Sequence, residues 1–194
     1  MVLHSLALHW ISTDNVASIL THECASSGFR TWSKLLQVRL ALANEAERLV
    51  EVINAAFRKA ESYIIDRNRV DLEFVESLFA KGEFLVAEEE GTHVGCVYLE
   101  FRGDRAYLGL LSVDPEHQKA GIGSMLMREA EQRCATAGCH FMDLRIIDLR
   151  TDNCAFYKRR GYVETGTEPF PSELQTKLPC HFVNMSEATA VKNL

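Results

Sequence analysis

Two glycines near the middle of the chain, Gly121 and Gly123, have the spacing of a phosphate-binding loop. They stand between an apolar segment that ends before Pro115 and a segment whose apolar residues recur at the period of an amphipathic helix. The first amides of a helix lack partners within it, and the positive end of its dipole lies there. Because glycine has no Cβ, a phosphate can approach those amides closely. Segment 118–124 therefore predicts a cradle for a diphosphate.

Two other phosphate loops fit this segment poorly. A P-loop requires Gly-Lys-Ser/Thr, but Ser124 and Met125 follow Gly123. A dinucleotide fingerprint requires a third glycine at the position that Leu126 occupies. The two glycines alone are explained equally well by an ordinary strand-to-helix turn. The glycines by themselves therefore do not exclude this alternative.

The residues around the glycines form a longer motif. A Val-Asp-Pro turn at 113–115 is followed by Gln118, Gly121 and Gly123. This order resembles the acetyl-CoA signature of the GCN5-related N-acetyltransferases (GNAT superfamily), Gln/Arg-x-x-Gly-x-Gly/Ala after a Val-x-Pro-type turn. The resemblance covers roughly residues 37–187 and implies acetyl-CoA as co-substrate, without a metal. The residues that it places against the coenzyme are Leu111, Ser112, Val113, Gln118, Lys119, Ala120, Gly121, Ile122, Gly123, Ser124 and Asn153.

The same resemblance implies how the reaction is arranged. The central strand, 105–113, and the strand 141–149 are expected to diverge, and the backbone of Leu111 and Val113 is expected to pair with the pantetheine arm. An amide at Val113 would stabilise the charge that develops on the thioester oxygen. Direct transfer to the acceptor in a ternary complex requires no cysteine nucleophile.

A second motif follows the predicted strand 141–149. The segment Phe-Tyr-Lys-Arg-Arg-Gly-Tyr at 156–162 resembles the family's Phe/Leu-Tyr-x-x-x-Gly-Phe/Tyr. Tyr157 is therefore the candidate acid that protonates the coenzyme thiolate, and a packing aromatic beside the cofactor is the alternative. Many members place an asparagine two helical turns before this tyrosine, where this chain has Arg150, and Asn153 stands one turn before it. Many members also carry a Glu on the central strand as the base, but this chain has none there, so the base is unassigned. Glu100 on the preceding strand is either a base acting through water or an exposed carboxylate.

Composition bounds the class of protein. The 194 residues, 47% hydrophobic and 25% charged, predict a globular domain, and the net charge of −6 argues against a general binder of nucleic acid or anionic membranes. None of the six cysteines forms a Cys-x-x-Cys pair, and we interpret them as reduced residues of a cytoplasmic protein rather than metal ligands. We predict an N-terminal extension at 1–36, an N-acetyltransferase domain at 37–188 and a tail at 189–194.

The hydrophobic periodicity predicts an α/β (mixed α+β) fold in the order β-α-α-β-β-β-α-β-α-β-β. The strands at 83–89, 93–101 and 105–113 form an antiparallel meander, and strand 141–149 runs parallel to strand 105–113 because a helix crosses between them. Asn44 is the expected N-cap of the first helix, and Asp152 or Asn153 that of the last. The resemblance implies the acyl-CoA N-acyltransferase fold, with a mixed sheet of six to seven strands and helices on both faces.

We therefore predict an acetyl-CoA-dependent N-acetyltransferase that acts on a primary amine of a small molecule or a peptide. Tyr63 and the loop 168–179 are expected to select the acceptor. A non-catalytic sensor of acyl-CoA and a nucleotide-phosphate binder are the alternatives. We further expect no nucleic-acid or membrane partner, a cytoplasmic location, and a monomer or homodimer.

Overall fold

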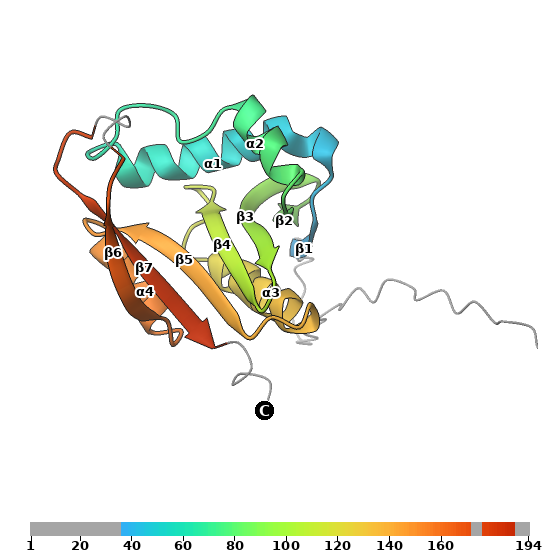
Figure 1. Ribbon diagram of the computed structural model, residues 1–194. Coiled ribbons are helices and arrows are strands. Elements are labelled where there is room, and N and C mark those ends of the chain that lie inside the picture. The colour runs from blue at the N-terminus through green and yellow to red at the C-terminus, as the bar shows by residue number, and fades with distance from the viewer. Residues whose placement is uncertain (1–35, 172–175, 189–194) are drawn as a thin grey trace, which may run out of the picture. The chain divides into compact units, whose positions relative to one another are not determined.

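The computed structural model describes residues 36–171 and 176–188 (Figure 1). The predicted N-terminal extension, apart from Leu36, and the predicted tail at 189–194 lie outside the described residues. The predicted acceptor loop 168–179 is described only in part, because residues 172–175 are outside as well.

One mixed sheet of seven strands runs through the described domain in the order β1-β2-β3-β4-β5-β7-β6. All neighbouring pairs are antiparallel except β4 and β5, which are parallel, as the crossover helix between them requires. The strands are β1 (Leu36–Leu40), β2 (Glu83–Glu89), β3 (Thr92–Arg102), β4 (Arg105–Val113), β5 (Phe141–Ile147), β6 (Val163–Pro169) and β7 (His181–Ala188).

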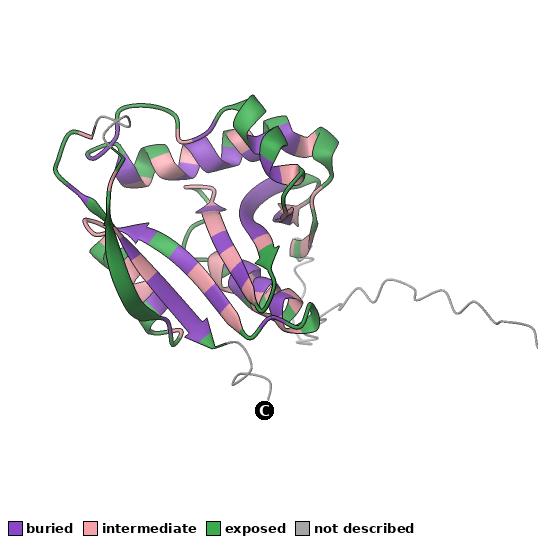
Figure 2. Cartoon of the chain, viewed as in Figure 1, coloured by how far each residue is buried: buried purple, intermediate pink, exposed green. Residues whose placement is uncertain are grey.

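Helices cover both faces of this sheet, as predicted. The helical elements are η1 (Ala43–Glu45), α1 (Ala46–Glu61), α2 (Leu72–Phe79), α3 (Ile122–Thr136) and α4 (Thr151–Lys158). Residues of α1 and α2, such as Leu49 and Val75, form one buried cluster with Phe84 of β2. Residues of α3 and α4, such as Leu126 and Tyr157, form the other with strands β2 to β5 and β7. In Figure 2 the buried residues concentrate on the central strands and the facing helices, while β6 is exposed along its whole length.

The two helix caps predicted from the sequence are both wrong. The cap found at α2 is Asp71, which accepts a hydrogen bond from the Phe74 amide at 2.8 Å. Asn44 does not cap α1: it lies inside the 3₁₀ turn η1, and the Glu45 carboxylate instead accepts from the Leu42 amide at 2.8 Å.

The start of α4 shows why the other cap prediction is wrong. Arg150 is the N-cap residue, and its guanidinium donates to Asp152 Oδ1 at 2.9 Å and to Asn153 Oδ1 at 3.0 Å. Charge-assisted bonds to a guanidinium are stronger than bonds to a neutral amide. The two side chains that were expected to cap the helix therefore bind Arg150.

The pairing of β4 with β5 stops half-way along β4. Their register runs from Arg105 opposite Phe141 to Leu108 opposite Leu144 and goes no further. Beyond this point β4 has an irregular register with β3, and Leu110 has a positive φ of 53°. β5 stays paired with β7 along its whole length. The two strands therefore separate after Leu108, which is the divergence that the sequence resemblance implies.

The described part of the chain contains no helix that is long and apolar enough to cross a membrane. Within that part, no disulfide joins any of the cysteines, which are Cys96, Cys134, Cys139, Cys154 and Cys180. Cys24 lies outside the described residues.

Candidate active site

A cavity of about 1010 Å³ lies where β4 and β5 separate. Residues from α1, the loop between α1 and α2, strands β3 to β5 and helix α4 line it. Among the predicted site residues, Leu111, Asn153 and Tyr157 belong to its lining. The cavity thus brings together residues from both ends of the domain's sequence.

The predicted phosphate loop has the backbone of an anion cradle. Lys119 and Gly121 both have left-handed backbone angles, φ 69° and 84°, and Gly121 is the N-cap residue of α3. Left-handed residues next to right-handed ones turn successive amides toward one point, which forms an anion-binding concavity. The Ser124 amide donates to Gly121 O at 3.0 Å, so Ile122 and Gly123 carry the amides that helix geometry leaves free.

Space is open above both glycines. A Cβ added at Gly121 would meet no atom within 4 Å, and one added at Gly123 would meet only Val113 Cγ2 at 3.6 Å. The Cβ positions of both glycines are therefore nearly free of neighbouring atoms, as a cradle for a diphosphate requires. Residues 118–124 themselves lie outside the cavity lining.

The turn before the loop is held by side chains. Gln118 Nε2 donates to Val113 O at 3.3 Å. His117 pairs with Asp114 at 3.1 Å and with Glu89 at 3.4 Å. Both side chains therefore tie the loop to the end of β4 and its turn. Ala120 and Lys119 are exposed beside this turn.

The three predicted coenzyme contacts at the end of β4 differ in their surroundings. Leu111 lines the cavity. Ser112 is buried, and its hydroxyl donates to Leu110 O at 3.0 Å, so only its backbone remains for a ligand. Val113 pairs with Gly95 of β3 and stands at the start of the turn toward the phosphate loop.

Tyr157 is the predicted acid, and its surroundings suit a proton donor. Its side chain is buried against Phe156 and Tyr162, with ring centroids 5.2 and 5.6 Å away. Burial raises the pKa of the Tyr157 hydroxyl, while the charges of Arg150 and Arg160 oppose the shift. The Tyr157 hydroxyl therefore keeps its proton at neutral pH. The neighbouring Tyr162 is a residue of the buried core.

Asn153 and Tyr157 stand four residues apart on α4, so they share one face of the helix, and both line the cavity. The Asn153 side chain does not cap the helix. Its Oδ1 accepts a hydrogen bond from Arg150 Nη2.

The acceptor side of the cavity differs from the sequence expectation in one residue. Tyr63 is exposed, bonds Leu149 O at 3.3 Å and lies outside the lining. The residues just after it, including Ile65 and 67–72, do line the cavity. Glu100 lines it too, but the carboxylate accepts from Arg102 Nε at 2.8 Å and Nη2 at 3.0 Å, and this pairing holds the Glu100 pKa below its usual value.

The structure adds one cavity residue that sequence reasoning missed. Glu61, at the end of α1, lines the cavity and pairs with Arg150 across 3.1 Å. A signal was present in the sequence: Glu61 falls four residues after Phe57 and eight after Ile53, on the apolar face of its helix.

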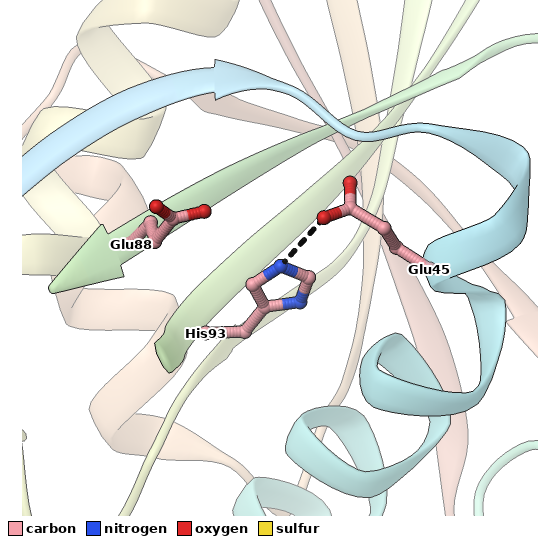
Figure 3. Close-up of side chains that lie close together, drawn as sticks. All are labelled: Glu45, Glu88 and His93. Carbon is pink, nitrogen blue, oxygen red and sulfur yellow. Dashed lines mark hydrogen bonds and ion pairs between the residues drawn. The ribbon is translucent and has the colours of Figure 1, made fainter. Parts of the chain in front are cut away.

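One group of potential metal ligands occurs among the described residues, remote from the cavity lining. Glu45, Glu88 and His93 have ligand atoms within 4.8 Å of one another, and Figure 3 shows His93 Nε2 directed at the Glu45 carboxylate, 3.1 Å away. The guanidinium of Arg39 already bonds both carboxylates, with Nη1 2.8 Å from Glu45 Oε2 and Nε 3.0 Å from Glu88 Oε2. We interpret this group as an ion-pair network that joins β1, η1, β2 and β3.

Residues 46–162 match the family model described as the acetyltransferase (GNAT) family, which covers more than half of the chain. The chain belongs to this family. The GNAT match includes β2 to β5, the phosphate loop and Tyr157, which are the parts that build the site described above.

Two curated relatives of this GNAT chain come from bacteria. It is 31% identical over 93 residues to an uncharacterized N-acetyltransferase of Chlorobaculum tepidum and 25% identical over 104 residues to the uncharacterized protein YdhI of Bacillus subtilis. These alignments cover 47% and 54% of this chain, and they span 57% and 64% of the relatives' own lengths.

Solved structures share the fold. The ribosomal-protein-S18-alanine N-acetyltransferase of Escherichia coli superposes with a TM-score of 0.67 at 14% identity, covering 80% of this chain and 94% of that one. The putative acetyltransferase yncA of Salmonella typhimurium, whose structure holds acetyl-CoA, superposes with a TM-score of 0.63 at 20% identity and the same two coverages. At these identities the likeness shows the fold alone.

Proposed function

We propose that this GNAT chain is an N-acetyltransferase that moves the acetyl group of acetyl-CoA directly to a primary amine, with both substrates bound at once. The observation that carries the proposal is the separation of β4 from β5 after Leu108, with the cavity and Tyr157 at the opening. Strand edges that lose their partner need other hydrogen-bond partners, and the amides of a pantetheine arm are suitable ones.

The phosphate loop supplies the second half of the binding site. The amides of Ile122 and Gly123 and the positive end of the α3 dipole would hold the diphosphate of the coenzyme. Lys119 is exposed beside them and would neutralise part of its charge. Held at both points, the coenzyme presents its thioester to the cavity.

Acetyl-CoA supplies an activated acyl group, and the residues of this chain would orient it and manage the protons. The amide of Val113 would donate to the thioester oxygen as that oxygen becomes negative. Tyr157 would give its proton to the leaving sulfur, because its raised pKa keeps it protonated until the thiolate forms. No cysteine is required as nucleophile.

The acceptor in this proposal is a small amine or a peptide amine, bound between the α1–α2 loop and β4. No nucleic-acid or membrane partner, a cytoplasmic location and a monomeric or homodimeric state stay predictions.

A panel of amines tests the proposal. Purified protein, acetyl-CoA and each amine are incubated, and release of the free thiol of CoA is followed. We expect release that depends on at least one amine. Tyr157→Phe should lower kcat by about 10²-fold or more while acetyl-CoA affinity stays near the wild-type value.

Tyr63→Phe is the matched control, because that hydroxyl lies outside the cavity lining. It should keep the wild-type rate. Tight acetyl-CoA binding without thiol release from any amine would favour the sensor alternative, and an unchanged kcat in Tyr157→Phe would remove the acid role of that residue.

A further inference from the structure

Glu61 is a buried carboxylate with one unused oxygen. It is 5% exposed, at the C-terminal end of α1, and it lines the cavity. Oε1 accepts from Arg150 Nη1 at 3.1 Å, whereas Oε2 is buried and has no hydrogen-bond partner within the described residues. Buried carboxylate oxygens normally have a partner, because leaving one unpaired is costly. An oxygen in this state beside a cavity indicates that a ligand supplies the partner.

Four charged or titratable groups from other segments of the chain face this carboxylate. Arg150 follows β5, Arg69 belongs to the α1–α2 loop, Asp152 begins α4, and the Cys180 thiol precedes β7. Burial has the largest effect and raises the Glu61 pKa above its usual value, while the two arginines oppose it. The carboxylate is therefore more basic than an ordinary glutamate.

The other acidic residues that line the cavity are already occupied. Asp71 caps α2 through the Phe74 amide at 2.8 Å. Glu100 accepts from Tyr98 at 3.3 Å and from Arg102 twice, and its pKa is lowered. Glu61 is thus the cavity-lining carboxylate, among those described, with both a free oxygen and a raised pKa.

Arg150 connects Glu61 to the helix that carries the proposed acid. It bonds Glu61 with Nη1 and Asn153 with Nη2 at 3.0 Å, and Asn153 shares a face of α4 with Tyr157. Glu61, Asn153 and Tyr157 all line one cavity. An acceptor nitrogen bound between the two residues would contact a base on one side and the reacting thioester on the other.

We propose that Glu61 Oε2 binds the ammonium group of the acceptor and removes its first proton. This inference rests on the proposed N-acetyltransferase function. The neutral amine then attacks the thioester carbonyl, so that a C–N bond forms and the C–S bond breaks. The nitrogen then passes its second proton to Tyr157, where it replaces the proton that Tyr157 gives to the sulfur. The proton on Glu61 leaves to solvent, and the nitrogen keeps its third hydrogen as the amide N–H.

The pH dependence of kcat/KM tests this role. With a base present, an alkyl amine with a pKa of about 10 can bind as the ammonium ion, so kcat/KM should be level between the pKa of Glu61 and that of the amine. In Glu61→Gln only the amine that is already neutral reacts. Its kcat/KM should rise about tenfold per pH unit up to the pKa of the amine.

Comparing two acceptors separates a base from a structural residue. At about pH 7 an α-amine with a pKa near 8 is about 100-fold richer in the neutral form than an alkyl amine with a pKa near 10. The loss of kcat/KM in Glu61→Gln should therefore be about 100-fold larger for the alkyl amine. A merely structural loss would be equal for both. Glu61→Asp, which keeps the carboxylate, should restore the level pH profile even if its rate is low, and it serves as the test variant should Glu61→Gln fail to fold.

Glu100→Gln is the comparison variant, and its pH profile should keep the wild-type shape. Two results would overturn the role of Glu61 and leave the acetyltransferase proposal intact. One is a kcat/KM of Glu61→Gln that stays level with pH. The other is a steep pH dependence of kcat/KM in Glu100→Gln alone. A wild-type protein that releases thiol with none of the amines would overturn both proposals.

Discussion

Asn54 holds the loop that lines the acceptor side of the cavity. It is buried on α1, and its Oδ1 accepts from the Arg69 amide at 2.8 Å and the Val70 amide at 3.1 Å. Its Nδ2 donates to Val70 O at 2.9 Å. One amide side chain therefore satisfies three backbone groups of the α1–α2 loop. We expect Asn54→Ala to be among the more destabilising single substitutions in the domain.

The expected loss follows from these three bonds. A typical intramolecular hydrogen bond contributes about 1 kcal/mol net, and a buried group left unpaired costs about 1–3 kcal/mol. Arg69 is only half-buried, so water can replace part of what its amide loses. We therefore expect Asn54→Ala to lower the free energy of unfolding by about 2–4 kcal/mol, out of the roughly 5–15 kcal/mol typical of a domain. Urea denaturation followed by circular dichroism measures it.

Two further variants give this measurement its controls. Asn54→Leu fills a similar volume without the hydrogen bonds, so it should stay as unstable as Asn54→Ala; recovery of stability would assign the loss to packing. Asn44→Ala changes an exposed asparagine in η1 that has no capping bond, and it should cost less than about 0.5 kcal/mol. Equal losses in Asn54→Ala and Asn44→Ala would refute the reasoning.

Two other predictions concern charge and space. Pairing with Arg39 holds the Glu45 pKa at about 2, below the usual 4.5, so its stabilisation is complete above about pH 4.5 and is lost as the pH falls toward 2. Between about pH 6 and pH 3, urea denaturation should show that the wild-type protein loses at most ~2 kcal/mol of stability that Glu45→Gln does not lose. An identical pH dependence in both proteins would contradict this prediction. Gly123→Glu places a negative charge beside the phosphate cradle and should weaken acetyl-CoA binding at least tenfold in calorimetry. The control is Gly123→Ala, because its methyl group would meet only one carbon, at 3.6 Å. This variant should unfold at the wild-type temperature. Wild-type affinity in Gly123→Glu would show that the coenzyme binds elsewhere.

The order and type of the elements were predictable from local pattern. A run of four apolar residues and a Glu-Gly turn define β2, whose predicted and observed bounds agree. The cap of α2 was not predicted, although Asp71 has a short side chain of the type that can reach a free helix amide. The parallel pairing of β5 followed from the crossover helix alone.

The wrong cap prediction at α4 comes from competition between neighbouring side chains. Asp152 and Asn153 are good caps by type, but Arg150 binds both of them, and the local sequence does not show that a guanidinium wins over the helix amides. The positive φ of Leu110 is equally hidden, since a leucine adopts it only where the sheet imposes it.

The candidate site divides in the same way. The phosphate loop and Tyr157 lie in contiguous motifs, so a resemblance was enough to propose them. Glu61 and Arg150 are 89 residues apart, and only the folded chain brings them together. The sequence shows Glu61 as an acidic residue on the apolar face of α1, but it does not show that Arg150 is its partner.

The most direct test of the coenzyme site is the melting temperature of the protein with acetyl-CoA, CoA or ATP. A ligand at about 100 times its Kd stabilises the folded state by about 2.7 kcal/mol, which is easily measured as a shift in Tm. Acetyl-CoA and CoA should both raise Tm, because each offers a diphosphate to the loop and a pantetheine arm to the gap between β4 and β5. ATP, which has no such arm, should leave Tm nearly unchanged. Stabilisation by ATP without stabilisation by CoA would contradict the account.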